Sequence, residues 1–220
     1  YDGSDQDSLV RSFSEGVYSF ARLYPNSSSF SGVKEKYKDN IIYSMQNATS
    51  YYYNFNLDRK SYNHTSKTTD AEKTAQQEAV LNKSFRQAIN FAYDRTAYGA
   101  QSQGEEGATK IIRNLFVPPS FVTLDGKDFG DVVASKMVNY GQVWQNVNFA
   151  DAQDAYYNAD KAKEAFAQAK KELEAKGVQF PIHLDLPVDQ SYKKGDHEAR
   201  SFKQSIASDL GADNVVIDIQ

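Results

Sequence analysis

The strongest constraint on the fold is an alternation of helix and strand signals between residues 158 and 219. Asn158 is a suitable N-cap for a helix that runs to Lys176 and ends at Gly177. Alternating apolar residues then predict a strand over 182–186, a helix over 198–210 and a last strand over 215–219. Strands separated by a helix at this spacing are typical of a crossover in an α/β layer. We therefore expect an α/β fold, with a mixed sheet and helices packed on it.

A second strong helix signal lies near the middle of the chain. It is an apolar stripe with helical spacing, formed by Phe85, Ala88, Ile89, Ala92 and Tyr93. A similar stripe on the later helix comprises Ala162, Ala165, Phe166, Ala169 and Leu173. Both stripes predict core-facing surfaces.

The segments that follow the central helix are expected to contain both loops and a further helix. That helix should end near Gly99 and be followed by a loop up to Ala108. Val117-Pro118-Pro119 cannot lie inside a helix, because proline lacks an N–H donor and restricts the residue before it. Residues 130–140 are expected to be helical.

The first part of the chain is predicted to be short helices and strands. Ser4 to Asp7 resembles a capping box that begins a helix ending at Gly16. A short charged helix is expected near 32–38, and strands are expected over 17–23, 41–43 and 51–57.

The predicted strand over 51–57 has two chemically different faces. Tyr51, Tyr53, Phe55 and Leu57 lie on one side, because successive side chains of a strand alternate. Tyr52, Asn54 and Asn56 lie on the other side, which is therefore a hydrogen-bonding face.

Several function classes lack the residues they need. The chain has no Cys and only three His, with no metal-ligand spacing among them, so no metal site is expected. No phosphate-binding loop, dinucleotide fingerprint or nucleophile elbow is present, so no cofactor is expected and none of these motifs indicates an enzyme. Nucleic-acid binding needs a basic stripe, which is absent from this chain of net charge −4. No apolar stretch is long enough to span a membrane.

Four motifs, in this order, resemble the peptide-binding family of ABC-importer substrate-binding proteins. The clearest is the helix from Asn82 to Arg95, and Tyr51–Asn56 precedes it. Val117-Pro118-Pro119 and the helix entry at Tyr157–Lys163 follow it, the latter with Ala159 where the family usually has proline. Asp39-Asn40-Ile41 and Phe55–Arg59 are similar to oligopeptide-binding lipoproteins of Gram-positive cocci, the Ami/Ali type.

This resemblance implies part of a two-lobed, periplasmic-binding-protein-like fold that closes on an oligopeptide and delivers it to a membrane permease. Residues 1–45 would end the first lobe and approach the hinge, and 46–220 would form the first portion of the second lobe. The protein would be extracytoplasmic, attached to the outer face of the bacterial membrane only by a lipid anchor outside these residues. The family's Gly-Trp…Asp-Tyr segment, which receives the peptide's amino terminus, is also expected outside them, so these residues alone should not bind peptide measurably.

The resemblance also selects candidate site residues. The matching strand of the family faces the peptide cleft, so Tyr52, Asn54 and Asn56 are the candidate ligand contacts, Asn56 being the weakest. Arg86, Asp94 and Arg95 are interpreted as structural contacts. His64, His183 and His197 are expected to be structural or solvated, with His183 the first to suspect of a role, and Glu105 and Glu106 to be solvated.

Two other functions remain open on the residues alone. A cell-surface module could use its tyrosine-rich surface to bind a partner protein. A carbohydrate-active enzyme would need two carboxylates that converge in a pocket, which a linear sequence cannot show.

Overall fold

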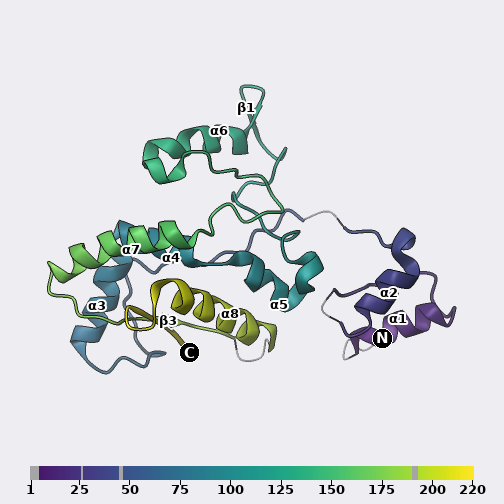
Figure 1. Cartoon of the computed structure of the whole chain (residues 1–220), viewed down its shortest axis with the longest axis horizontal. Coiled ribbons are helices and arrows are strands. Elements are labelled where there is room, and N and C mark those ends of the chain that lie inside the picture. Colours follow the sequence, from purple (N-terminus) through teal and green to yellow (C-terminus); the bar gives the residue numbers. More distant parts are fainter. Residues whose placement is uncertain (1–4, 26, 45–46, 190–192) are drawn as a thin grey trace.

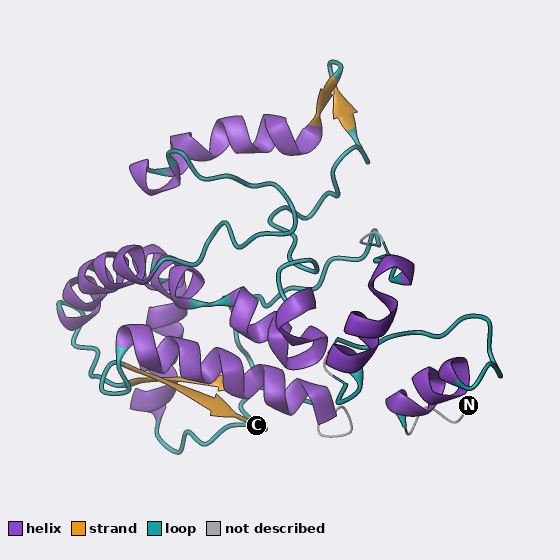
Figure 2. Cartoon of the chain, turned by 45° about the vertical axis from the view of Figure 1, so that its right-hand side comes forward, coloured by secondary structure: helices purple, strands orange, loops and turns teal. Residues whose placement is uncertain are grey.

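The computed structural model describes residues 5–25, 27–44, 47–189 and 193–220 (Figure 1). The alternation predicted for the C-terminal part is confirmed: α7 (Ala159–Glu174), β3 (Ile182–Leu186), α8 (Lys193–Leu210) and β4 (Val215–Ile219) follow one another. Strands β3 and β4 are parallel, and their register runs from Ile182 opposite Val215 to Leu186 opposite Ile219. This arrangement is compatible with the expected α/β class, but the expected mixed sheet is not seen: helices dominate, and the strands of the described residues form one parallel and one separate antiparallel pair (Figure 2).

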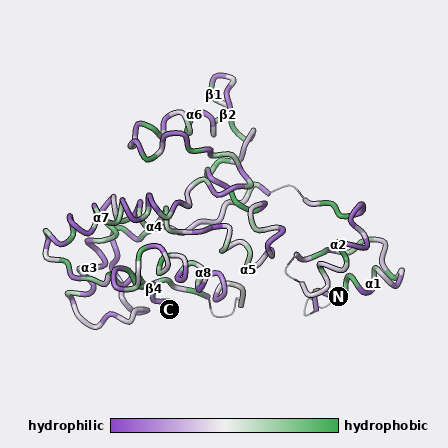
Figure 3. The backbone as a smooth tube through the Cα atoms, in the orientation of Figure 1, coloured by the Kyte–Doolittle hydropathy of each residue, from purple (hydrophilic) through white to green (hydrophobic). Residues whose placement is uncertain are grey.

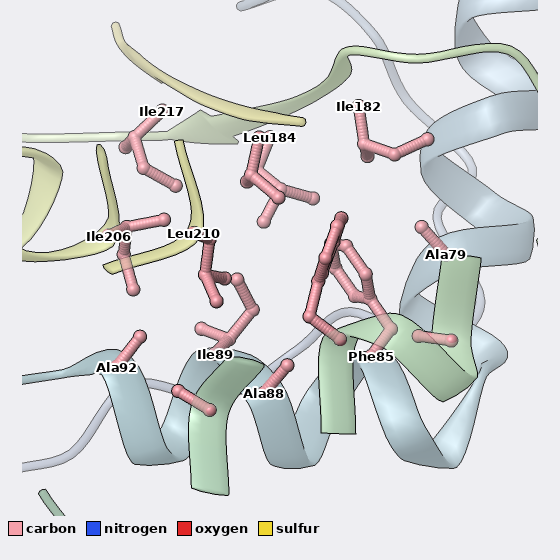
Figure 4. Packing of buried hydrophobic residues seen from close by; sticks show 14 of the residues in the cluster. Ala79, Phe85, Ala88, Ile89, Ala92, Ile182, Leu184, Ile206, Leu210 and Ile217 are labelled. Atoms are coloured by element: carbon pink, nitrogen blue, oxygen red, sulfur yellow. The ribbon is translucent and has the colours of Figure 1, made fainter. Parts of the chain in front are cut away.

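The core lies between α4 (Lys83–Ala92), α7, α8 and the β3–β4 pair. Phe85, Ala88, Ile89 and Ala92 are buried as predicted, while Tyr93 is half-buried at the edge. Figure 4 shows Phe85 and Ile89 pointing toward the residues of the sheet and α8 that cover them. The stripe of α7 is buried as well, except for the partly exposed Ala165.

A separate helix, α3 (Asp70–Leu81), packs against α4 and β3. Asn82 divides α3 from α4, and its side-chain Oδ1 accepts a hydrogen bond from the Phe85 N–H at 2.8 Å. This side-chain cap starts α4 in a new direction and directs its apolar stripe to the core.

The predicted loop over 99–108 is wrong, because helix α5 (Arg95–Gly107) occupies it, with a kink at Gly104. Asp94 caps this helix: its Oδ1 accepts from the Ala97 N–H at 2.8 Å. Gly99 is buried, and a Cβ at that position would lie 2.6 Å from the Ala108 carbonyl oxygen. The glycine therefore permits a close backbone approach and does not interrupt the helix.

The first part of the chain holds α1 (Gln6–Ser14), α2 (Phe30–Tyr37) and the 3₁₀ turn η1 (Lys38–Asn40). Asp5 caps α1, while Ser4, where the sequence places the cap, lies outside the described residues. The strands predicted over 17–23, 41–43 and 51–57 are all wrong. Their residues suit a sheet, but among the described residues no neighbouring strand pairs with them.

Residues 115–148, which we call the excursion, extend for most of their length away from the core (Figure 1), and Val143 and Trp144 near their end pack back against it. They contain β1 (Thr123–Leu124), β2 (Lys127–Asp128), α6 (Phe129–Met137) and the 3₁₀ turns η2 (Val138–Tyr140) and η3 (Gln142–Trp144). The predicted helix over 130–140 and the break at Val117-Pro118-Pro119 are confirmed. Figure 3 shows hydrophobic and hydrophilic residues alternating along the excursion, and none of the residues of α6 is buried.

A capping box at the start of α3 gives the fold a pH-dependent element. The Glu72 carboxylate accepts hydrogen bonds from the backbone N–H groups of Thr69 and Thr68, both at 2.9 Å, which lower the pKa of Glu72 from 4.5 to about 2. A pKa lowered in the folded state stabilises the fold above pH 4.5, and that stabilisation is lost as pH falls toward 2. We expect Glu72→Gln to lower the thermal midpoint at pH 6, with the difference from wild type shrinking below pH 4.5. Thermal unfolding at stepped pH measures this, and a difference independent of pH would contradict it.

Candidate functional site

The candidate ligand contacts lie on residues 51–57, which we call the Tyr51–Leu57 segment. Tyr53 and Phe55 face the body of the protein: the Tyr53 ring lies 5.3 Å from the Phe202 ring, and Phe55 packs against the core. Tyr52, Asn54 and Asn56 are exposed. The two predicted faces are thus confirmed in the middle of the segment, whereas Tyr51 is 90% exposed and Leu57 is also exposed.

The backbone of this segment is available for pairing. Among the described residues, no backbone N–H or C=O of residues 51–56 hydrogen-bonds to another backbone group. Asn56 Oδ1 accepts from the Asp58 N–H at 3.1 Å, which forms a local turn and occupies that oxygen. An unpaired stretch of this kind can hydrogen-bond to an extended peptide, as an exposed sheet edge does.

The N-terminal end of the segment is held by residues that precede and begin the excursion. Ser50 Oγ donates to the Phe116 carbonyl oxygen at 3.1 Å, and Arg113 Nη1 donates to the Thr49 carbonyl oxygen at 3.4 Å. The Tyr52 and Phe116 rings meet edge to face, with centroids 4.9 Å apart. Two chain regions more than sixty residues apart are thereby joined beside Tyr52.

The C-terminal end of the segment is held by α3 and by a buried group of charges. Gln77 Nε2 donates to the Leu57 carbonyl oxygen at 2.6 Å. Two residues further on, Arg59 Nη1 lies 2.5 Å from Asp185 Oδ2 on β3. Lys67 Nζ lies 3.0 Å from the other carboxylate oxygen. We call Arg59, Thr65, Lys67 and Asp185 the Asp185 cluster.

The Asp185 cluster is almost closed to solvent. The side chains of Lys67 and Asp185 are 1% and 3% exposed, and that of Arg59 is 12% exposed. Burial acts to raise the pKa of Asp185, but hydrogen bonds from Thr65, Arg59 and Lys67 outweigh it and hold the pKa below its usual value. The carboxylate is therefore charged at neutral pH and ties residues 59–67 to the sheet.

An aromatic group supports the inner face of the segment. Tyr53 OH donates to Tyr98 OH at 3.4 Å, and Tyr98 OH donates to Glu198 Oε2 at 3.2 Å. Burial raises the pKa of Tyr98, and that of Tyr53 is raised as well, so both hydroxyls are neutral donors at neutral pH. Their bonds connect the segment to α5 and α8.

The residues around Arg95 have structural roles, as the sequence predicted for Arg86, Asp94 and Arg95. Arg95 Nε donates to Asp154 Oδ1 at 3.0 Å, and Arg95 Nη2 donates to Asn114 Oδ1 at 2.6 Å. Asn114 Nδ2 in turn donates to the Ala150 carbonyl oxygen at 2.6 Å. This Arg95 network therefore joins the two ends of the excursion. Asp94 caps α5, and Arg86 Nη1 donates to the Val80 carbonyl oxygen.

The remaining polar candidates also have structural surroundings. His183 Nδ1 lies 3.0 Å from Asp218 Oδ2 on the paired strand, the His64 carbonyl oxygen accepts from Arg59, and His197 is exposed. Glu105 is exposed as expected, and the Glu106 side chain, 35% exposed, also forms an ion pair with Lys34 at 2.8 Å. Nowhere in the described part of the chain do three His, Asp or Glu side chains gather as a metal site would require.

Two open grooves lie elsewhere. One, of about 530 Å³, lies between α4 and α6, and the other, of about 590 Å³, lies between α5 and α8. Tyr52, Asn54 and Asn56 line neither of these two grooves. No helix within the described ranges is long and apolar enough to cross a bilayer.

Sequence reasoning missed two parts of this arrangement. Phe116 directly precedes Val117-Pro118-Pro119, and no local pattern predicts its contact with the Tyr52 ring. Lys67 and Asp185 are separated by over a hundred residues, and nothing local in the sequence links them. The polar position of Asp185 within an apolar strand was the available signal.

No family model matches the chain. The whole of this chain is similar to part of several oligopeptide-binding proteins of streptococci. The chain is 72% identical to AliB and 58% identical to AmiA of Streptococcus pneumoniae, in each case over all 220 residues, and 53% identical to SarA of Streptococcus gordonii over 219 residues. It covers 34%, 33% and 33% of the length of these proteins. The chain is thus homologous, along its whole length, to about one third of each of the Ami, Ali and SarA oligopeptide-binding proteins of streptococci.

Proposed function

We propose that the chain is part of the substrate-binding component of an ABC importer and forms one wall of a site that binds an oligopeptide between two lobes. The observation that carries this proposal is the Tyr51–Leu57 segment. Its backbone is unpaired, its outer side chains are exposed, and both of its ends are held by the rest of the fold. The names of the relatives identify the same class of ligand.

In this proposal, the peptide lies extended along the segment. Main-chain hydrogen bonds would supply affinity without reading the peptide's sequence. Tyr52 and Asn54 would add side-chain contacts, and Asn56 would add a weaker one because its Oδ1 already accepts a hydrogen bond. No chemical step is involved, so the protein is not an enzyme and needs neither metal nor cofactor.

The division into lobes is part of the proposal. Residues 1–45 would end the first lobe and approach the hinge, and 46–220 would begin the second. In support, α1 and α2 contribute no residue to the main core cluster and lie apart from it (Figure 1). The partners would be an oligopeptide and a membrane permease, with no nucleic acid, and the location would be the outer face of the bacterial membrane through a lipid anchor. The alternative of a cell-surface interaction module has no comparable support.

Replacing the outer side chains tests the proposal. We expect Tyr52→Ala and Asn54→Ala each to weaken peptide binding by about tenfold, the loss of one good contact, and Asn56→Ala to weaken it less. The measurement is calorimetric titration of the complete gene product with single peptides that have been separated from a peptide mixture.

Tyr51→Ala is the matched control, because Tyr51 is 90% exposed and, among the described residues, no ring contact joins it to Phe116. It should leave the affinity unchanged. Unchanged peptide affinity in the Tyr52 and Asn54 variants would remove both residues from the site.

A further inference from the structure

We propose that the Tyr52 and Phe116 rings together form an apolar subsite that selects peptides with a bulky apolar or aromatic side chain at one position. The inference rests on the proposed function and adds a specificity-determining residue, Phe116, to it. The two rings come from segments that lie far apart in the sequence, and neither helix periodicity nor strand alternation predicts that they meet.

The geometry of the pair leaves space for a third side chain. The rings meet at 87° with centroids 4.9 Å apart, which is the favoured edge-to-face arrangement. Tyr52 is 65% exposed and Phe116 is 70% exposed, so most of each ring still faces solvent. Exposed apolar surface that is gathered in one place can mark a site for a further apolar group.

The pair is fixed in place before any ligand arrives. Ser50 Oγ donates to the Phe116 carbonyl oxygen at 3.1 Å, which sets the backbone on either side of the rings. Two residues earlier, Asn114 is 5% exposed, and its carbonyl oxygen accepts from Tyr156 OH at 2.5 Å. Rigid presentation of this kind lowers the entropic cost of binding, as expected for a recognition surface.

The neighbouring backbone identifies the occupant as a peptide side chain. Residues 51–56 have unpaired backbone groups directly beside the pair. A peptide paired with that backbone would project every second side chain to the same face, so one of them would lie over Tyr52. Asn54 and Asn56 continue the same face as polar positions, which leaves one apolar position at the Tyr52 end.

The test compares pairs of peptides that differ only by Phe or Ser at one position, scanned along the peptide, with the complete gene product. We expect wild type to prefer Phe at one position, and Phe116→Ala to reduce that preference about threefold to tenfold, the range of one aromatic contact. Tyr52→Ala should reduce the same preference at the same position. The double variant should lose little more than either single variant, because both remove one shared contact.

Phe121→Ala is the matched control. Phe121 is 68% exposed and lies in the same excursion, but no ring contact joins it to Tyr52 within the described residues. The preference should be unchanged in this variant.

Two results would overturn the inference, and a third, distinguishable from them, would overturn the proposed function. A Phe116→Ala variant with normal affinity and the full preference at every position would show that the pair is not a subsite. A lowered thermal midpoint with the preference intact would show that Phe116 packs only within the protein. Failure of the wild-type protein to bind any peptide would instead overturn the proposed function itself.

Discussion

Asp185→Ala is expected to destabilise the protein by about 3–5 kcal/mol, the usual cost of removing one partner from a buried ion pair. The Lys67 side chain is 1% exposed and that of Arg59 is 12% exposed, so neither cation can regain full hydration once the carboxylate is gone. Thr65 Oγ1, which donates to Asp185 Oδ2 at 2.7 Å, would also lose its acceptor. Urea unfolding of the complete gene product measures the change.

Asp58→Ala supplies the matched control. Asp58 pairs with Lys60 at 2.6 Å, but the two side chains are 79% and 81% exposed, so its loss should cost less than about 1 kcal/mol. The double variant Lys67→Met with Asp185→Leu should regain part of the stability, because it leaves fewer buried charges than the single variant. A cost below 1 kcal/mol for Asp185→Ala would show that water enters the cluster and screens it.

The Asp185 cluster also has a functional consequence. It fixes residues 59–67 to β3, and Arg59 follows the Tyr51–Leu57 segment by only two residues. Breaking the Asp185 cluster should therefore weaken peptide binding beyond the effect of the lost stability. A segment that is no longer held must become ordered when the peptide binds, which costs entropy.

The elements predicted correctly are those with signals confined to a few neighbouring residues. Helix α7 has its cap at Asn158, a regular apolar stripe and a stop at Gly177, where φ is +79°. Strand β3 alternates apolar and polar residues over its five positions, and in β4 every second position is an apolar residue, namely Val215, Ile217 and Ile219. These local patterns agree with one another, and the fold follows them.

The errors arise where the structure depends on distant residues. Residues 17–23 and 51–57 have strand-forming side chains, but a strand also needs a neighbour to receive its hydrogen bonds, and composition cannot reveal whether one is present. The sequence predicts a helix end near Gly99, whereas this glycine lies inside α5 and admits the Ala108 carbonyl oxygen from a later turn. Phe116 and the Asp185 cluster were missed for the same reason, because their partners lie far along the chain.

The outward positions of Tyr52 and Asn54 could be predicted from the sequence, because side-chain alternation depends only on neighbouring residues. The pattern correctly separated the outward Tyr52 from the inward Tyr53, even though the segment is not a strand. Side-chain alternation can persist where the backbone is unpaired, since packing of Phe55 on the core and the contact of the Tyr53 ring with Phe202 are enough to orient the segment.

The second large effect is expected at Arg95. The guanidinium lies against Asp154, Asn114 and the Arg113 carbonyl oxygen, and it stacks 4.6 Å from the Tyr156 ring centroid. Arg95→Met would leave the Asp154 carboxylate, 8% exposed, without its cation, at a cost of about 3–5 kcal/mol. Urea unfolding again measures the change.

Arg95→Lys separates charge from geometry in this network. Lysine keeps the positive charge but cannot contact Asp154 and Asn114 through a planar fork, so an intermediate loss is expected. Because Asn114 precedes Phe116 by two residues, both variants should also reduce the peptide preference assigned to the Tyr52 and Phe116 rings, with Arg95→Met the stronger. If Arg95→Met lowers stability but leaves that preference intact, Phe116 must be held by Ser50 alone, and the Arg95 network serves the fold without positioning the site.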